Sequence, residues 1–380
     1  MNRFDITKGQ PKAWSILSRA KKLERVASTY LVHGPEGVGA WSLALEFAAL
    51  LNCEEPGGQP DRPAPLPCGE CRNCRAIFNL DFEGMHLVVP IPSHKNLEEA
   101  IDLTRATLDQ KREEPFSPLD RARPIGIPIE LAREVRRRLV IRGRAGVIRV
   151  VLFYQMETMR VASADALLKM IEEPPPDTVI ILTAVRPESL SPTILSRAQK
   201  IRLERLPETM VVEYLMAKHG ATETAARLMA RVYERSLGRA IESAAGAEGE
   251  ESDERSVGLM LFKTLMTEPA SELVAQMGGL LNFNNRGAAE HLVRLWQSLI
   301  RDGAYLANTS DEAGLVNVDF APEIKQVSPR LSDPAVVDRM ALTTKNTLAD
   351  LSLNVHIQPA LVAMVLKLKA DMKASAATDG

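Results

Sequence analysis

A glycine-rich turn between a strand-like run and a helix-like run constrains the fold of this chain more than any other feature. Residues 30–33 (YLVH) are apolar, and the turn 34–39 (GPEGVG) follows them directly. From residue 41 to 51, apolar side chains recur on one helical face. A strand, a glycine loop and a helix in this order are typical of the phosphate-binding loop that opens an α/β nucleotide fold.

The turn lacks the side chains that a working phosphate loop uses on ATP. Such a loop places Lys and then Ser or Thr after its last glycine, but here Ala40 and Trp41 follow it. An acidic pair that holds Mg²⁺ is also expected after a later strand, and Tyr154 and Gln155 occupy those positions. The loop glycines still offer backbone amides to a phosphate: Gly34, Gly37 and Gly39. We therefore expect no ATP hydrolysis by this chain, while nucleotide binding without turnover, or a turn that binds nothing, stays open.

Strand-like and helix-like runs alternate through the first half of the chain. Further strand-like runs occur at residues 87–89, 147–154, 179–183 and 200–203, with helical patterns at 129–139 and 163–171. This alternation predicts a parallel sheet with helices on both faces. A proline-rich, charged stretch at about 91–128 is predicted to be an insertion, with a solvent-exposed helix that Asn96 caps and that ends near Arg112.

Strand signals stop after residue 206, and helical patterns continue to residue 373 with an irregular loop predicted at 307–334. An acidic, glycine-containing stretch at 246–254 is interpreted as a linker. The predicted division is an α/β domain over 1–205, a small helical domain over 206–250 and a C-terminal helical domain over 251–380.

The bulk composition narrows the classes of protein. A formal net charge of −2 excludes a generally basic nucleic-acid coat, so a DNA contact would have to be a local patch. No apolar run approaches the roughly 20 residues that span a bilayer, and the first residues lack the apolar core of a signal peptide. We expect a cytoplasmic protein without a membrane partner.

All four cysteines lie between residues 53 and 74. Their spacing is Cys68-x2-Cys71-x2-Cys74, and fourteen residues separate Cys53 from Cys68. Clustered thiols in a cytosolic chain favour a metal site over a disulfide framework. Four thiolates suit a tetrahedral, structural Zn²⁺, so we expect a folded hairpin and not a reaction centre. Four free thiols are the alternative.

Several segments of the chain carry a resemblance to a known family. Residues 166–203 (ALLKMIEEPPPDTVIILTAVRPESLSPTILSRAQKIRL) closely resemble the core of bacterial clamp-loader subunits in the AAA+ family. Similar too are GQPKAWSIL near the start, the glycine loop with its flanks, and the cysteine knuckle after it. The resemblance covers about residues 5–248, and NVHIQPALVAMVLKLK near the end is similar to the last helix of that family's collar domain.

The resemblance implies a fold and a role. The fold is an AAA+ sheet with a small helical lid and a C-terminal collar for oligomerisation. Without the loop lysine and the acidic pair, the chain is similar to the non-hydrolysing subunit type, a stator in the DNA polymerase III clamp loader. Such a subunit sits in a heteropentameric ring with motor (gamma/tau) and delta subunits, and the ring loads the sliding clamp on primer-template DNA during DNA replication.

Particular residues take roles from the same resemblance. Arg197, in Ser196-Arg197-Ala198, matches the arginine finger that reaches the ATP of a neighbouring subunit, where its charge would stabilise the transition state. Thr183 falls at the first sensor position, and Arg239 is a candidate for the second. Alanine replaces the cysteine that usually follows the finger.

Three alternatives remain open. Arg133 and Arg137 share a helix face in the densest basic region, which is either a solvated face or a contact to DNA phosphates. The chain as a whole could instead be a motor-type clamp-loader ATPase with atypical substitutions at its nucleotide site. A zinc-dependent DNA-binding module outside any ring is the third alternative, which the net charge disfavours.

Overall fold

The computed structural model describes residues 5–59, 62–119, 125–141, 143–159, 167–246, 250–280, 286–309, 312, 314–352 and 355–376. The chain forms two compact units. The first comprises Met1–Gly220 with Tyr233–Glu242, and the second comprises Ala221–Val232 with Ser243–Gly380. The three-part division at 205 and 250 stays a prediction.

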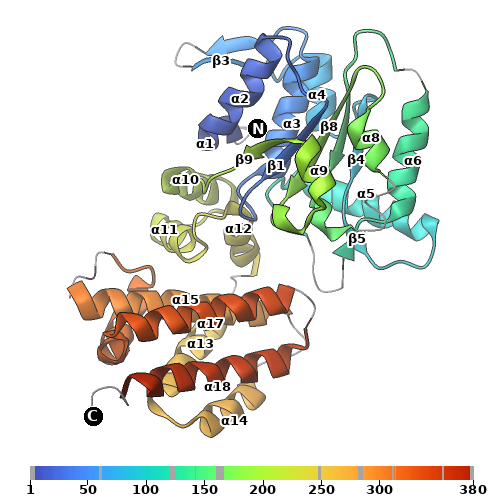
Figure 1. Cartoon of the computed structure of the whole chain (residues 1–380). Coiled ribbons are helices and arrows are strands. Elements are labelled where there is room, and N and C mark those ends of the chain that lie inside the picture. The colour runs from blue at the N-terminus through green and yellow to red at the C-terminus, as the bar shows by residue number, and fades with distance from the viewer. Residues whose placement is uncertain are drawn as a thin grey trace. The chain divides into compact units, whose positions relative to one another are not determined.

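A five-stranded parallel sheet lies at the centre of the first unit (Figure 1), with the order β4-β7-β8-β1-β9. Its strands are β1 (Thr29–His33), β4 (Met85–Val88), β7 (Arg149–Phe153), β8 (Thr178–Ala184) and β9 (Gln199–Arg202). Every pairing between them is parallel. Both β7 and β8 are buried along their whole length, which explains their unbroken apolar runs. All five predicted strands are confirmed.

Helices cover both faces of this sheet. Successive side chains of a strand point to opposite faces, so Tyr30 and Leu31 mark the two sides. The Tyr30 ring meets Phe47 of α3 (Ala40–Asn52) edge-on, with 5.1 Å between ring centroids. Leu31 instead belongs to a buried cluster with side chains of α6 (Ile129–Val140), α8 (Leu168–Glu172) and α9 (Pro192–Arg197). The predicted parallel sheet with helices on both faces, followed by helices, is confirmed.

The predicted insertion has a structure of its own. Its base is closed by β5 (Ile91–Pro92) and β6 (Ile125–Gly126), which pair antiparallel. Between them runs α5 (Leu97–Glu113), whose first turn is capped as predicted: the Asn96 side chain accepts the Glu99 N–H at 2.9 Å.

The remaining elements of the first unit surround the sheet. They are α1 (Ile6–Gly9), α2 (Pro11–Lys22), the antiparallel hairpin β2 (Gly57–Gln59) and β3 (Arg62–Leu66), α4 (Arg72–Phe78), α10 (Glu208–His219), and the short 3-10 turns η1 (Met156–Thr158) and η2 (Pro187–Ser189). The hairpin lies between two cysteine positions, as expected. Gly220 ends α10 in a left-handed conformation with φ +65°, which glycine adopts without strain.

The second unit is helical around one apolar core. Its elements are α11 (Glu223–Val232), α13 (Glu250–Thr267), α14 (Ala270–Leu280), α15 (Arg286–Thr309), η3 (Val318–Phe320), α16 (Ala321–Val327), η4 (Ser328–Leu331), α17 (Pro334–Ser352) and α18 (Ile357–Ala376). Helix α12 (Leu237–Gly246) begins in the first unit and ends in the second. Trp296 lies fully buried at the core of the bundle and donates its indole N–H to the Gly258 carbonyl at 3.0 Å.

The predictions of a linker and of an irregular loop are wrong, and one predicted helix lies partly outside the described residues. Helix α13 begins inside the stretch predicted as a linker. The loop predicted at 307–334 contains α16, which begins with Pro322 in its first turn. The buried Asp302 carboxylate orders the approach to it by accepting the Asn317 N–H at 2.8 Å. Of the helix predicted at 163–171, residues 163–166 lie outside the described residues.

Among the described residues, no helix is both long enough and apolar enough to span a membrane.

Candidate functional site

The glycine loop keeps the backbone shape of a phosphate loop. It leaves the carboxyl end of β1, the end at which parallel α/β sheets bind ligands. Gly37 and Gly39 have φ of +74° and +98°, a region that only glycine enters without strain. Gly39 is also the N-cap of α3, the position where a helix offers free N–H groups to an anion.

Large side chains fill the space over this loop. Trp41 is buried, and its ring meets the Tyr154 ring edge-on with 5.3 Å between centroids. The cavity that the loop lines with these two residues has a volume of only about 30 Å³, whereas small-molecule pockets usually measure about 300 to 1,000 Å³. Trp41 and Tyr154 therefore fill part of the space over the loop.

Gln155, at a position of the missing acidic pair, and Thr183, at the first sensor position, form a hydrogen bond that supports the backbone. Gln155 has a left-handed conformation, and its N–H donates to the Thr183 hydroxyl at 2.8 Å. Thr183 is buried, so that hydroxyl supports the turn after β7. Glu157, the nearest acid in this run, accepts the Val185 N–H at 2.7 Å, and burial raises its pKa.

The start of α12 closes another side of the loop. Ser236 donates its hydroxyl to the Glu36 carbonyl at 2.7 Å, and the Gly238 N–H donates to the Gly37 carbonyl at 3.2 Å. Arg239, the candidate for the second sensor, pairs with the Glu36 carboxylate at 3.3 Å. The guanidinium thus binds the loop of its own chain.

Lys111 of α5 is a buried residue that the sequence argument missed. Its side chain is 1% exposed, with Nζ 3.4 Å from the Tyr154 hydroxyl and 4.8 Å from the centre of the Tyr154 ring. Nζ also donates to the carbonyls of Pro115 and Ser117. Burial lowers the pKa of Lys111 to about 8, opposed by the charges of Glu36 and Glu114. The expectation of a solvent-exposed helix is therefore wrong at this residue.

The turn after α5 links the loop to α10. Glu114 accepts the Tyr214 hydroxyl with both carboxylate oxygens, at 2.7 and 2.9 Å, and lies 3.4 Å from His219. Burial and the Glu114 charge raise the pKa of Tyr214. Phe116 lines the loop cavity and packs against the Tyr214 ring, with 5.6 Å between centroids. A signal was present in the sequence, since Pro115 and Phe116 interrupt an otherwise charged stretch.

Arg197 is the last residue of α9 and its side chain is 41% exposed. The guanidinium Nε lies 2.8 Å from the Glu172 carboxylate, at the end of α8. A second nitrogen donates to the Thr193 carbonyl at 3.3 Å. An exposed pair of this kind contributes at most about 1 kcal/mol, so Arg197 is oriented by its neighbours yet easily redirected to another anion.

The basic helix α6 presents two predicted phosphate contacts to solvent. Arg133 and Arg137 are both exposed, but Arg137 pairs with Glu134 at 2.7 Å, which reduces the local positive charge. Arg149 of the same basic stretch is buried and donates to the Leu139 and Ile141 carbonyls. Arg142 lies outside the described residues.

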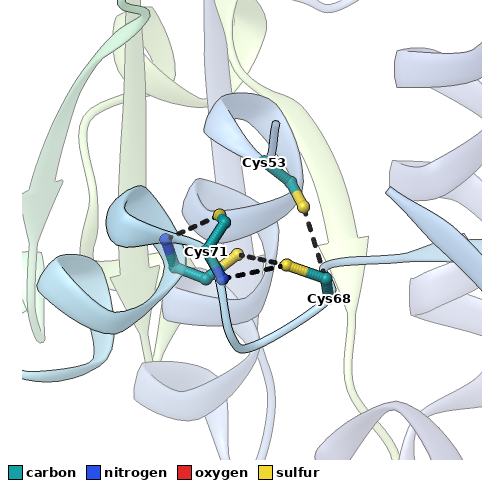
Figure 2. Close-up of side chains that lie close together, drawn as sticks. Cys53, Cys68 and Cys71 are labelled. Carbon is teal, nitrogen blue, oxygen red and sulfur yellow. Dashed lines mark hydrogen bonds between the residues drawn. The ribbon is translucent and has the colours of Figure 1, made fainter. Parts of the chain in front are cut away.

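The four predicted metal ligands come together (Figure 2). The Sγ atoms of Cys53, Cys68, Cys71 and Cys74 all lie within 4.8 Å of one another. Cys53 directly follows α3, Cys71 caps α4, and Cys74 lies in its first turn. A tetrahedral site with Zn–S bonds of about 2.3 Å would separate its sulfurs by about 3.8 Å, and the Cys68 and Cys74 sulfurs are 3.9 Å apart. The residues fit a four-thiolate metal site.

Backbone N–H groups point at these sulfurs. Cys68 donates to Cys53 Sγ at 3.3 Å, Cys71 to Cys68 Sγ at 3.2 Å, and Cys74 to Cys71 Sγ at 3.4 Å. The bond from Cys71 lowers the pKa of Cys68 to about 7, whereas burial raises the pKa of Cys53 and of Cys74. The arrangement therefore favours thiolate at the exposed sulfur of Cys68 more than at the two more buried sulfurs.

Several known proteins are similar in sequence to this chain. The chain is 24% identical over 360 residues to the DNA polymerase III subunit delta' of Bacillus subtilis, covering 95% of this chain and 96% of that protein. It is 33% identical over 194 residues to the delta' subunit of Pseudomonas aeruginosa, covering 51% and 47%. It is 30% identical over 278 residues to the tau subunit of Escherichia coli, covering 71% and 37%.

A solved structure, a gamma subunit-related protein of DNA polymerase III from Thermotoga maritima, aligns over 94% of this chain and 99% of its own at 14% identity, with a TM-score of 0.36. The sequence family described as DNA polymerase III, delta subunit, matches residues 9–207, just over half of the chain. The chain therefore belongs to the DNA polymerase III delta subunit family, whose members are clamp-loader subunits.

Proposed function

We propose that this chain is a delta-prime-like stator of the DNA polymerase III clamp loader, which hydrolyses no ATP itself and supplies Arg197 to the ATP of a neighbouring subunit. The observation that carries the proposal is the phosphate loop, which keeps its backbone shape but has Ala40 and the buried Trp41 in place of its functional side chains. The exposed Arg197, held by one carboxylate, supports the second half of the proposal.

The proposal extends to partners and cofactor. Relatives named as tau and tau/gamma subunits support a heteropentameric ring with motor (gamma/tau) and delta subunits, acting on the sliding clamp and primer-template DNA. The lid over 206–250 and the collar over 251–380 would join the chain to that ring. Zn²⁺ would be structural, held by the four cysteines, and it would fix the knuckle without taking part in a reaction.

Reconstitution tests this function. The purified chain alone should show no ATP turnover above background, because it lacks the groups that bind and activate the γ-phosphate. Added to motor and delta subunits of the same organism, it should be required for clamp loading on primed DNA. ATP turnover by the isolated chain that disappears on substitution near Gly39 would instead establish the motor-type ATPase. Loading that is equally fast without the chain would refute the stator role.

A contact of α6 with DNA is also part of the proposal. Replacing Arg133 and Arg137 together with Ala should lower the salt dependence of DNA binding by the whole loader, by about 1 to 2 in the slope of log K against log salt concentration. Fluorescence anisotropy of a labelled primer-template over a salt series measures it. Arg105→Ala, an exposed arginine on α5, is the matched control. An unchanged slope would assign α6 to a merely solvated face.

A further inference from the structure

The insertion supplies the residues that lie over the degenerate phosphate loop. We propose that the segment from Lys111 to Phe116, called here the 111–116 segment, is the permanent occupant of the nucleotide site, excludes nucleotide from it, and ties α10 to the sheet. The proposal concerns this chain's own site and is independent of the proposed role of Arg197 at a neighbour's site.

Phe116 lies close to Gly39, at the start of α3. A Cβ built on Gly39 would lie 3.0 Å from a ring carbon of Phe116 and 2.3 Å from the Ile6 side chain. Gly39 starts α3, where a bound phosphate would accept backbone N–H groups. Two apolar side chains therefore lie against the end of the helix that would bind an anion. Phe116 and Ile6 thus restrict the space in which a phosphate would have to lie.

Three backbone segments contact one another around the loop. A Cβ on Gly238 would lie 2.5 Å from the Phe116 carbonyl oxygen and 3.0 Å from Gly37. The Gly238 N–H in turn donates to the Gly37 carbonyl. The 111–116 segment, the start of α12 and the phosphate loop are thus in direct contact.

The positive charge near the loop comes from Lys111 of the insertion. A working loop has a lysine for the β- and γ-phosphates, and this loop has none. Lys111 instead brings an ammonium beside Tyr154, from a helix of the insertion. Its donors are used by the carbonyls of Pro115 and Ser117 and by the Tyr154 hydroxyl, all within the chain. This cation stabilises the 111–116 segment and is not directed at a ligand.

Glu114 and Phe116 connect the 111–116 segment to α10 through Tyr214. Glu114 holds the Tyr214 hydroxyl with both carboxylate oxygens, and Phe116 packs on the same ring. One short segment therefore joins the phosphate loop and α10. In an ATP-binding subunit, nucleotide would lie in this place; here a covalently attached segment does, and the joint is independent of nucleotide concentration.

A two-by-two set of variants tests exclusion. The probe is a fluorescent ADP analogue titrated into the full-length chain and followed by anisotropy. Ala40→Lys restores the loop lysine but should leave binding as weak as in the wild type, because the 111–116 segment stays in place. Adding Phe116→Ala should tighten binding at least tenfold relative to Ala40→Lys alone. Ala40→Lys with Arg105→Ala, altered on the exposed face of α5, should behave like Ala40→Lys alone.

Two results overturn the exclusion. Equal, tight binding by Ala40→Lys with and without Phe116→Ala would mean that the segment does not block the site. Equal, absent binding by both would mean that something other than Phe116 keeps nucleotide out. Circular dichroism melts of each variant identify any that fail to fold, and Phe116→Leu replaces Phe116→Ala in the titration in that case.

A double-mutant cycle tests the tie to α10 without nucleotide. Glu114→Gln and Tyr214→Phe, singly and together, are compared by urea unfolding of the full-length chain. Because both side chains join in one buried hydrogen-bonded pair, we expect the two changes to be coupled by about fivefold or more in the unfolding equilibrium constant. Additive effects would overturn the tie.

Discussion

Arg197→Ala should abolish ATP hydrolysis at one site of the assembled loader while leaving the ring assembled. An arginine finger contributes about 10³-fold or more to the rate of phosphoryl transfer, because its charge stabilises the transition state. We therefore expect a single-turnover burst that is short by one ATP per loader, with the missing site slowed at least about a thousandfold. Rapid-quench measurement of the burst on primed DNA with the sliding clamp present determines it.

The matched control is Arg144→Ala. Arg144 is likewise an exposed arginine paired with a glutamate, here Glu83 at 3.3 Å, and it belongs to the same unit. Its replacement should leave the burst intact. Arg197→Lys should recover only part of the rate, because an ammonium lacks the planar fork of the guanidinium. A full burst from the Arg197→Ala loader would show that the neighbour's site takes no group from this residue.

The sheet could be predicted from sequence because its signals are local. Strands β7 and β8 are continuous apolar runs, which a parallel sheet buried on both faces requires. The clustering of the cysteines was predictable for the same reason, since the spacing of Cys68, Cys71 and Cys74 within one short segment leaves few ways to separate their sulfurs. The acidic stretch around residue 250 misled because its residues suit both a linker and a helix start.

The occupant of the phosphate loop could not be predicted from sequence. Lys111 lies in a charged, helical stretch, and lysine is almost never fully buried unless it is paired. Its burial follows from where the insertion folds back, which is a long-range contact that no local pattern encodes. The loop itself shows only which functional groups are missing. The structure adds that Phe116 lies against Gly39.

Loss of zinc should unfold the cysteine knuckle and lower the stability of the first unit. A structural site of this class binds zinc with about 10 to 16 kcal/mol at pH 7, which corresponds to a Kd below about 100 nM. We expect about one zinc per chain in freshly purified, reduced protein, measured by plasma emission spectrometry. Removal by a chelator should expose amides of α4 to hydrogen exchange, because buried Cys74 and Ile77 anchor that helix.

Zinc affinity should fall as the pH is lowered, because the metal binds thiolates and protons compete for them. The burial that raises the pKa of Cys53 and Cys74 makes this competition strong at those two sulfurs. Competition with a chromophoric chelator at pH 6.5 and 8.0 measures it, with tighter binding expected at pH 8.0.

Cys74→Ala should weaken zinc binding by more than about a hundredfold, whereas His86→Gln, at the nearest histidine in sequence, should not. Metal-free protein whose stability and hydrogen exchange do not respond to added zinc would refute the site and leave the four cysteines as free thiols.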